Sequence, residues 1–598
     1  MKRSRNRAIF CGGVAAAALA FAIPAAGQRE RSPESLLPPG FGEQPPPPRE
    51  PATPPPPGPA PAPAPGPSGV QPIAPDGGIL EDAAQQDLEA LAAQELPPPI
   101  EIPDDARRPT DRVGPLTPAN WGLGERSFGN VNGAFASALM RRLDAPLPSR
   151  WTSILLRRAL LSHVPTPVYA QDVDWVAERA WLLLRMGDAD GARALVQSID
   201  VDQFTPRMFT VAVQTALATA DPAALCPLVQ PGRAVSAEPI WPLADAMCAA
   251  LAGDSARASQ LIDEARGRSG AGGIDVLLAE KVVGAGLDTR RAVTIQWEGV
   301  DSLNSWRFGL ASATGLEIPQ RLMDSTGLQV RAWAARAPMV PLERRLASAH
   351  AAAALGIFSN ASLVELYSLI GDQTDPSEIE ESAAGRLRRA YVAGSFSDRL
   401  AGMRSLWDEP KDPIGRYASH ILTAAAAARM PPSAEYQDRA ADLIASMLTA
   451  GFDRQAARWG PIVDSMGSDG DRAWALLAIA SPRPSVDIGA GRVQSFVDRA
   501  EGPRGRMLVA ALAGLGRFAD PAALGVNPAR RSRWSNMIAA AARAQEPATV
   551  ALLAGVGMQP RDWAGVPPEH LYHIVAALRQ VGREYEARMI AAEALSRL

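Results

Sequence analysis

Two stretches, MGDADGARALV (186–196) and AGDSARASQLI (252–262), decide the fold of this chain because they place Gly, Asp and Ala at the same relative positions. Gly187 and Gly253 are 66 residues apart. Halfway between them lies Ala220 in ATADPAALC, and Gly286 in GAGLDTRRA follows at the same interval. Four turns therefore share a period of 33 residues, which is close to that of a two-helix repeat. The period predicts stacked pairs of helices.

The sequence around these turns has the spacing of helices. Apolar residues that recur at helical intervals before the first turn are Val173, Val176, Ala177, Ala180, Trp181 and Leu184. Gly187 then ends the helix, since glycine is the usual residue of a left-handed C-terminal turn. A second helix continues through Ala192 and Leu195. Sustained period-two alternation is absent from the sequence, so the expected fold is all-α, an α-solenoid of stacked antiparallel helix pairs over residues 113–598.

The C-terminal half carries a looser version of the same pattern. Its turns are expected at Ser481-Pro482, Gly516, Glu546-Pro547 and Gly582. From about 290 to 480 the repeat is weak, and helix boundaries there stay open.

One helix start in this weak region is well marked. Asp375 is suited to cap a helix, Pro376 to occupy its first position and Glu378 to close a capping box. Glu378, Glu380 and Glu381 are therefore expected in the first turn, where carboxylates favour the helix macrodipole. We interpret these acids as structural and not as a catalytic cluster.

At the turn residues the sequence resembles tetratricopeptide-like (TPR-like) repeats. That family places a small residue in the first helix, a Gly-containing turn, and then an Ala that lets the second helix approach closely. The matching positions are Ala180, Gly187 and Ala192 in one unit, Ala246, Gly253 and Ala258 in another, and Gly582, Ala587 and Ala594 in a third. The family's first-helix Trp and closing Pro are mostly missing, so a generic α-solenoid stays open. The resemblance implies a scaffold that binds proteins or peptides along a concave face, without catalytic residues.

The N-terminus has the order of a secretory signal peptide. A basic leader, MKRSRNR, precedes the apolar run AIFCGGVAAAALAFAI (8–23) and small residues at Ala25, Ala26 and Gly27. The run is short for a membrane span of roughly 20 residues. We expect cleavage near Gly27, with an uncleaved anchor as the alternative. No later segment approaches a membrane span, so the expected location is periplasmic or secreted.

A proline-rich tether is expected to follow the leader. Residues 33–75 are dominated by proline, which removes the backbone donor and fixes φ. We predict that residues 28–112 form a disordered spacer with a short helix at 81–96. A docking tract for a protein or a cell-wall polymer is the alternative role.

Charge and motif content exclude several classes of function. The formal net charge of −4 becomes more negative once the basic leader is removed, which disfavours nucleic-acid binding. His570 and His573 form an i, i+3 pair that would need a third ligand to hold zinc. GLGRFA (514–519) mimics a phosphate loop but follows an Ala-rich helix. We expect no metal, no cofactor and no catalytic residue.

Two cysteines remain after the leader, Cys226 and Cys248. Export favours a disulfide between them. The repeat register places Cys226 at the end of one unit's second helix and Cys248 in the first helix of the next unit. The alternative is two buried free thiols. In a solenoid of nearest-neighbour contacts, such a cross-link would act locally.

These features favour a non-enzymatic periplasmic scaffold or adaptor that binds protein or peptide partners of the envelope. The first alternative is a cell-wall enzyme or its accessory, because α-superhelical domains also occur in lytic transglycosylases. Those enzymes add a lysozyme-like domain with a catalytic Glu, and the sequence offers no such block. A carbohydrate- or peptide-binding protein is the second alternative.

Overall fold

The computed structural model describes residues 103–598 except 239, 270–272 and 288–292. Of these residues 66% are helical and 1% lie in strands, so the expected all-α class is confirmed. The leader, the proline-rich stretch and the helix expected at 81–96 lie outside the described residues. None of the helices found in the described part of the chain combines the length and the apolar character needed to cross a bilayer.

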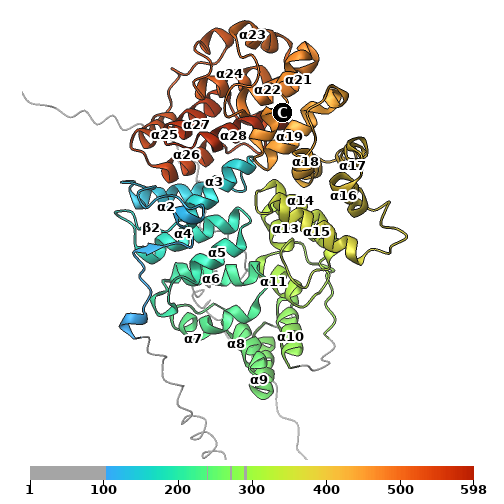
Figure 1. The fold of residues 1–598 in the computed structure, drawn as a ribbon. Helices are drawn as coiled ribbons and strands as arrows, with labels where there is room; N and C mark the ends of the chain where they lie inside the picture. The colour runs from blue at the N-terminus through green and yellow to red at the C-terminus, as the bar shows by residue number, and fades with distance from the viewer. Residues whose placement is uncertain (1–102, 239, 270–272, 288–292) are drawn as a thin grey trace, which may run out of the picture.

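In Figure 1 the chain runs from the blue helices in the middle of the view to the green helices at the bottom, and then through the yellow helices on the right to the red helices at the top. The descending helices are α2 (Gly133–Arg142), α3 (Arg150–Leu161), α4 (Asp172–Arg185), α5 (Ala189–Val196), α6 (Pro206–Ala218), α7 (Cys226–Val235), α8 (Ile240–Leu251) and α9 (Ser255–Ser269). The next helices are α10 (Ile274–Gly286), α11 (Ser305–Ala313), α12 (Gln320–Asp324), α13 (Leu328–Ala334), α14 (Leu342–Ala354), α15 (Asn360–Gln373), α16 (Ala383–Val392) and α17 (Phe396–Asp408).

The upper part of the molecule is formed by the last third of the chain. Its helices are α18 (Pro413–Ala427), α19 (Ala440–Thr449), α20 (Asp453–Ala457), α21 (Gly460–Ser465), α22 (Asp471–Ala480), α23 (Ala490–Arg499), α24 (Arg504–Gly514), α25 (Arg533–Arg543), α26 (Pro547–Gly557), α27 (Pro568–Gln580) and α28 (Glu584–Arg597). Short 3₁₀ helices occur at η1 (Asp104–Ala106), η2 (Pro118–Asn120), η3 (Val201–Gln203), η4 (Pro222–Leu225), η5 (Ala434–Arg439), η6 (Gly467–Gly470), η7 (Ala522–Leu524) and η8 (Trp563–Gly565). Two short strands, β1 (Arg112–Val113) and β2 (Val164–Pro165), pair antiparallel.

The repeated Gly-Asp turn has a physical cause in the structure. Gly187 and Gly253 have φ values of +92° and +85°, which glycine adopts without strain and which end α4 and α8. The following Asp188 accepts a hydrogen bond from the Gly191 amide at 3.0 Å and so caps α5. Asp254 accepts from the Arg257 amide, also at 3.0 Å. In each Gly-Asp pair, the glycine therefore ends one helix and the aspartate caps the start of the next helix.

Three of the other expected turns contain a left-handed residue, and the φ values of Ala220, Gly516 and Gly582 are +52°, +71° and +73°. At the turn expected at Glu546-Pro547 the left-handed residue is the preceding Gln545, with a φ of +58°. The two remaining turns differ. Gly286, however, is the last residue of α10 and is not left-handed, because the helix runs through the position where the 33-residue period places a turn. Ser481 ends α22 in an extended conformation. The period therefore holds for three successive units and then stops.

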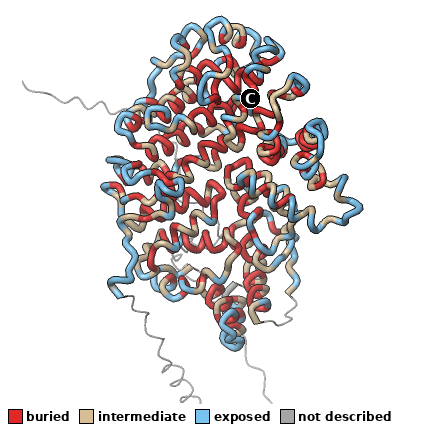
Figure 2. The backbone as a smooth tube through the Cα atoms, viewed as in Figure 1, coloured by how far each residue is buried: buried red, intermediate tan, exposed pale blue. Residues whose placement is uncertain are grey.

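The helix expected to start at Asp375 begins later. Asp375 accepts hydrogen bonds from the amide and hydroxyl of Ser377, which gives a local turn in place of a helix start. Ser382 is the actual N-cap of α16 and accepts from the Gly385 amide at 3.0 Å. The expected first-turn position of Glu378, Glu380 and Glu381 is therefore wrong, and these acids lie in the loop before α16, which Figure 2 shows as largely exposed.

The two ends of the described chain pack against each other. Helices α26 and α28 lie on α3, and Figure 1 shows these red and blue helices side by side. A single apolar cluster extends from Val113 to Leu595, so the first and last helices share one core. Since an open solenoid contacts only its neighbours along the chain, this arrangement is a helical stack whose ends meet.

Glu593 on α28 joins the two ends by capping α3. Its carboxylate accepts hydrogen bonds from the Ser149 hydroxyl at 2.7 Å and from the amides of Arg150 and Trp151 at 2.8 and 3.1 Å. Arg597 donates to the same carboxylate at 2.8 Å. Because the first amides of a helix lack partners within it, a residue more than 440 positions away completes α3.

Arg150 extends this junction to the other side of the molecule. Its guanidinium donates to the backbone carbonyls of Ala353 and Phe358 in the turn between α14 and α15, the latter at 3.0 Å. It also reaches the Thr449 carbonyl at the end of α19. Burial lowers the pKa of Arg150, and the nearby Glu593 carboxylate acts against that shift. Helix α3 is therefore connected to three segments that are distant in sequence, namely α28, the turn between α14 and α15, and the end of α19.

Other arginines also donate hydrogen bonds to several backbone carbonyls at once. Arg179 donates to the carbonyls of Leu160, Val113 and Ser162 at 2.7, 3.0 and 2.8 Å, and burial lowers its pKa to about 9. Arg517 donates to the last carbonyls of α22. A planar guanidinium serves several carbonyls at once, which a lysine ammonium does less well. The arginines that dominate the positive charge of the chain therefore connect helix ends.

A matched pair of glycine substitutions separates backbone strain from tertiary contact. Gly253→Ala places a side chain at positive φ with nothing within 4 Å, so we expect a loss of about 1 kcal/mol in unfolding free energy. Gly187→Ala adds a methyl group 2.9 Å from the Ala332 side chain on α13, and we expect about 2 kcal/mol. Urea titration followed by circular dichroism measures both losses. Equal losses would contradict the close contact between the α4–α5 turn and α13.

Candidate functional site

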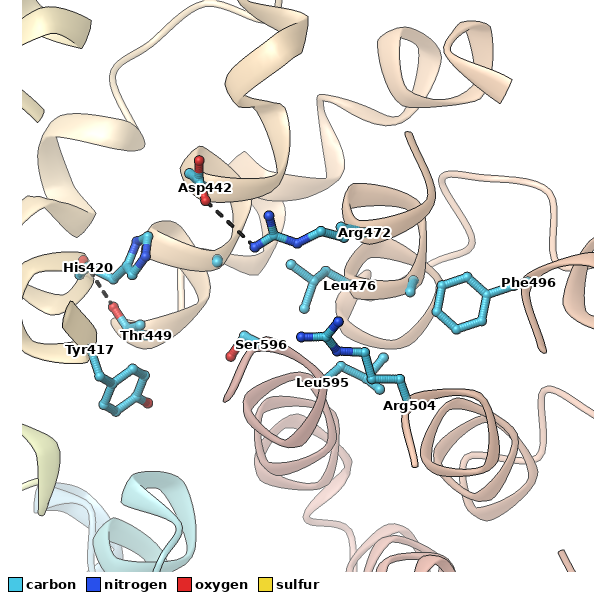
Figure 3. A pocket seen from close by; sticks show the side chains of 12 residues that line it. Tyr417, His420, Asp442, Thr449, Arg472, Leu476, Phe496, Arg504, Leu595 and Ser596 are labelled. Atoms are coloured by element: carbon cyan, nitrogen blue, oxygen red, sulfur yellow. Dashed lines mark hydrogen bonds and ion pairs between the residues drawn. The ribbon is translucent and has the colours of Figure 1, made fainter. Parts of the chain in front are cut away.

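A small pocket lies where α18, α19, α22, α24 and α28 approach one another near the C-terminus. Its volume is about 70 Å³. Figure 3 shows side chains from all five helices directed at this opening, together with Phe496 from α23. We call it the arginine pocket because Arg472 and Arg504 both line it.

The two arginines give the pocket its positive character. Arg472 comes from α22 and Arg504 from the first position of α24, and Figure 3 shows both guanidinium groups extending toward the same space beside Leu476. Arg472 has a weak ion pair with Asp442 at 3.8 Å, and its side chain is 73% exposed. Among the described residues Arg504 has no carboxylate within ion-pair distance. The N-terminus of α24 adds partial positive charge.

His420 is the titratable group of the opposite wall. It stacks on Trp407 with ring centroids 5.3 Å apart, and its Nδ1 atom is buried without a hydrogen-bond partner in the described part of the chain. Burial lowers the pKa of His420 to about 4, and Arg472 lowers it further whereas Asp442 raises it. The imidazole is therefore neutral at neutral pH, and the arginines decide the sign of the pocket.

Apolar and aromatic side chains form the rest of the wall. Leu476, Phe496 and Leu595 line the side opposite His420. Tyr417 lies under the guanidinium of Arg597, with 4.5 Å between that group and the ring centroid. Burial raises the pKa of Tyr417, so its hydroxyl stays protonated. The pocket therefore combines a cationic side with an apolar side.

This chemistry fits binding better than bond cleavage. Hydroxyl groups near His420 donate to its backbone carbonyl, Ser446 at 2.6 Å and Thr449 at 3.5 Å, and not to its ring. Activation of a serine or threonine needs a hydrogen bond to the imidazole itself, and the described residues of this pocket do not form one. Two guanidinium groups beside an apolar wall instead suit a carboxylate attached to an apolar body.

The residues expected to pack the repeats lie inside the helix pairs. Ala180, Ala192, Ala246, Ala258, Ala587 and Ala594 are fully buried. Gly187, Gly253 and Gly582 occupy left-handed turns between paired helices. None of these nine residues lines the arginine pocket, so their place in the structure is architectural.

Cys226 and Cys248 are joined in the structure. Their Cα atoms are 5.5 Å apart, and the bond connects the first residue of α7 to α8. This placement differs from the expected one, in which Cys226 ends the second helix of a unit. The 3₁₀ helix η4 takes the position after the Ala220 turn, and α7 begins only at Cys226 because Pro227 suits the first turn of a new helix.

The histidine pair and the glycine motif have structural partners. On α27, His570 donates from Nδ1 to the Gly557 carbonyl at 2.9 Å, and the ring centroids of His570 and Trp534 are 4.4 Å apart. His573 is buried, which lowers its pKa. Within the described residues no group of three or more potential ligands is arranged around a metal position. Gly514 packs against Val575 of α27, and Gly516 ends α24 at positive φ.

Comparison of the chain with protein-family models, with curated proteins and with solved structures gave no match.

Sequence reasoning did not single out the residues of the arginine pocket. Arg472 and Arg504 are two among many arginines, and His420 stands in a plain amphipathic helix. Their meeting depends on how α18, α22 and α24 pack.

Proposed function

We propose that this chain is an exported, non-enzymatic scaffold of TPR-like helix pairs that binds protein or peptide partners in the cell envelope. The observation that carries the proposal is the convergence of Arg472 and Arg504 on one pocket with an apolar wall. The leader at residues 1–27 supports export. The left-handed turns between buried, alanine-rich helices support the TPR-like interpretation.

The size of the pocket favours a terminal carboxylate as the group it receives. A volume of about 70 Å³ has room for the end of a chain, with its carboxylate and last side chain, and not for a longer segment. Arg504 lacks an acidic partner among the described residues, so it can pair with a ligand without first breaking an ion pair. The last side chain of a bound peptide then packs on Leu476 and Phe496. We infer that the partner offers a free C-terminus that ends in an apolar residue.

Titration with a matched pair of peptides tests this function. The probes are fluorescein-labelled Gly-Ser-Gly-Ser-Ala-Leu with a free C-terminus and the same peptide as its C-terminal amide. Fluorescence anisotropy should give at least about tenfold tighter binding of the free acid, because a hydrogen bond to a charged group contributes about 1.5–3 kcal/mol. Binding should weaken with added salt, since the arginines are partly exposed.

Substitutions locate the binding. Arg504→Ala should reduce the affinity for the free acid about tenfold or more and leave the weak binding of the amide unchanged. Arg389→Ala is the control, because Arg389 is an exposed arginine on α16 that does not line the pocket. Equal affinity for acid and amide, or an Arg504→Ala variant that binds like the native protein, would contradict the proposed site. Steady release of soluble fragments from peptidoglycan by the pure protein would contradict the non-enzymatic part.

A further inference from the structure

A second cavity, separate from the arginine pocket, lies among α11, α12, α13 and α14. Its volume is about 340 Å³, which is within the range of pockets that hold small molecules. It shares no lining residue with the arginine pocket. We call it the Ser312 cavity.

The buried part of the Ser312 cavity is lined mainly by apolar side chains. Phe308 and Ala334 are buried residues that line it. Half-buried side chains that complete the walls are Leu316, Ile318, Met323 and Val340, and the half-buried Ser348 and the exposed Gln320 add polar groups. The buried apolar part of this lining suits the apolar body of a small molecule.

Ser312 is the one buried polar side chain of this lining. Its exposed fraction is 1%, and its hydroxyl has no hydrogen-bond partner among the described residues. Buried hydroxyl groups in proteins nearly always find a partner, because leaving one unpaired is costly. Other helix hydroxyls of this region satisfy the rule, as Thr314 donates to the Leu310 carbonyl at 2.9 Å. The Ser312 hydroxyl is therefore available to a polar atom of a ligand.

Two ion pairs and one further carboxylate lie at the rim. Arg344 pairs with Glu317 at 2.9 Å, and Arg331 pairs with Asp324 at 3.2 Å. Glu343 also lines the cavity and is exposed, with no ion-pair partner among the described residues. A cationic or anionic ligand would have to compete with the two ion pairs, and Glu343 would also repel an anion. The rim therefore disfavours a strongly charged molecule.

The wall of the cavity is held in place by backbone contacts. Arg345 donates to the Val340 carbonyl at 2.6 Å. On the other side, the Leu316 amide donates to the Ala311 carbonyl at 2.9 Å after the left-handed Gly315. A cavity whose walls are fixed in this way loses little free energy in closing around a ligand.

We propose that the Ser312 cavity is a binding site for a small, uncharged, mainly apolar molecule that carries one hydroxyl or carbonyl group at its buried end. The apolar body fills the space between Phe308 and Met323, and the polar group pairs with the Ser312 hydroxyl. This site is independent of the proposed peptide scaffold, because its residues belong to other helices.

Three probes with the same bicyclic body test the ligand class. They are 2-naphthol, naphthalene and 2-naphthoate, which differ only in the polar group. Protein labelled at the methionine methyl carbons reports binding through the Met323 signal, which is assigned by its loss in Met323→Leu. We expect both 2-naphthol and naphthalene to shift the Met323 signal. The affinity for naphthalene should be about fivefold lower than the affinity for 2-naphthol. 2-Naphthoate should bind more weakly than 2-naphthol.

Two variants and two controls assign the contacts. Ser312→Ala should lower the affinity for 2-naphthol about fivefold to the level of naphthalene, whereas Ser137→Ala, in a buried serine of α2, should leave it unchanged. Ala347→Trp should abolish binding, because Ala347 is exposed and lines the cavity. The control Ala361→Trp lies at an exposed position of α15 outside it. An unshifted Met323 signal, tighter binding of 2-naphthoate, or full binding by Ala347→Trp would overturn the proposal.

Discussion

Glu593→Ala is expected to lower the free energy of unfolding by about 3–5 kcal/mol, because it leaves buried partners on both ends of the chain uncompensated. The Ser149 hydroxyl and the amides of Arg150 and Trp151 lose their acceptor. The buried Arg150 guanidinium also loses the carboxylate whose charge opposes the lowering of its pKa by burial. Urea titration followed by tryptophan fluorescence measures the loss, and hydrogen exchange should show reduced protection in α3 and α28 together.

Two further variants show whether the loss comes from the cap. Glu593→Gln keeps one carbonyl acceptor, so its loss should be smaller than that of Glu593→Ala. Glu380→Ala removes a carboxylate whose side chain is 73% exposed and whose ion pair with Arg389 is 3.7 Å long. Exposed pairs of this kind contribute about 0–1 kcal/mol. If Glu593→Ala were no more harmful than Glu380→Ala, the junction of the two chain ends would not stabilise the protein.

Removal of the Cys226–Cys248 disulfide is expected to destabilise the whole described body by about 3 kcal/mol, the loop-closure contribution for a loop of this size. The sequence alone predicts a local effect, because an open solenoid transmits stability only between neighbours. The junction of α3 with α26 and α28 changes this expectation. Since the two ends share a core, the helices near the disulfide and those near the C-terminus should unfold together.

The size of the shift in melting temperature distinguishes the two cases. A cooperative unit as large as the helical body has an unfolding entropy of about 1 kcal/mol/K, so Cys226→Ala with Cys248→Ala should lower its melting temperature by about 3 °C. By the same reasoning, the melting temperature of a single helix-pair unit that unfolds alone would fall by about 40 °C. Differential scanning calorimetry of the native and doubly substituted proteins, with and without reductant, gives the measurement. Two separate transitions, with the C-terminal one unmoved, would support local unfolding.

The helix pairs were predictable where local chemistry alone decides them. Gly187 and Gly253 adopt positive φ, and the Asp that follows each of them caps the next helix. These are contacts within a few residues, so the sequence displays them. The prediction failed at Gly286 and at Asp375, where helix-ending and helix-starting residue types stand at positions that the neighbouring helices use differently.

The arginine pocket was not predictable, because no local pattern brings its residues together. His420, Arg472 and Arg504 belong to α18, α22 and α24, and each helix by itself is an ordinary amphipathic or Ala-rich segment. The Ser312 hydroxyl is equally inconspicuous in the sequence. It becomes notable only because the fold buries it without a hydrogen-bond partner among the described residues.

The sequence by itself determined the all-α class and the helix pairs near residues 187, 220, 253 and 582, because helical periodicity and turn residues act over a few positions. Only the tertiary structure decided that the two ends of the helical stack pack against each other. That junction depends on Glu593 meeting the first turn of α3, a contact between residues more than 440 positions apart. Nothing local marks such a pair, since burial and packing of whole helices bring the carboxylate and the unpaired amides together.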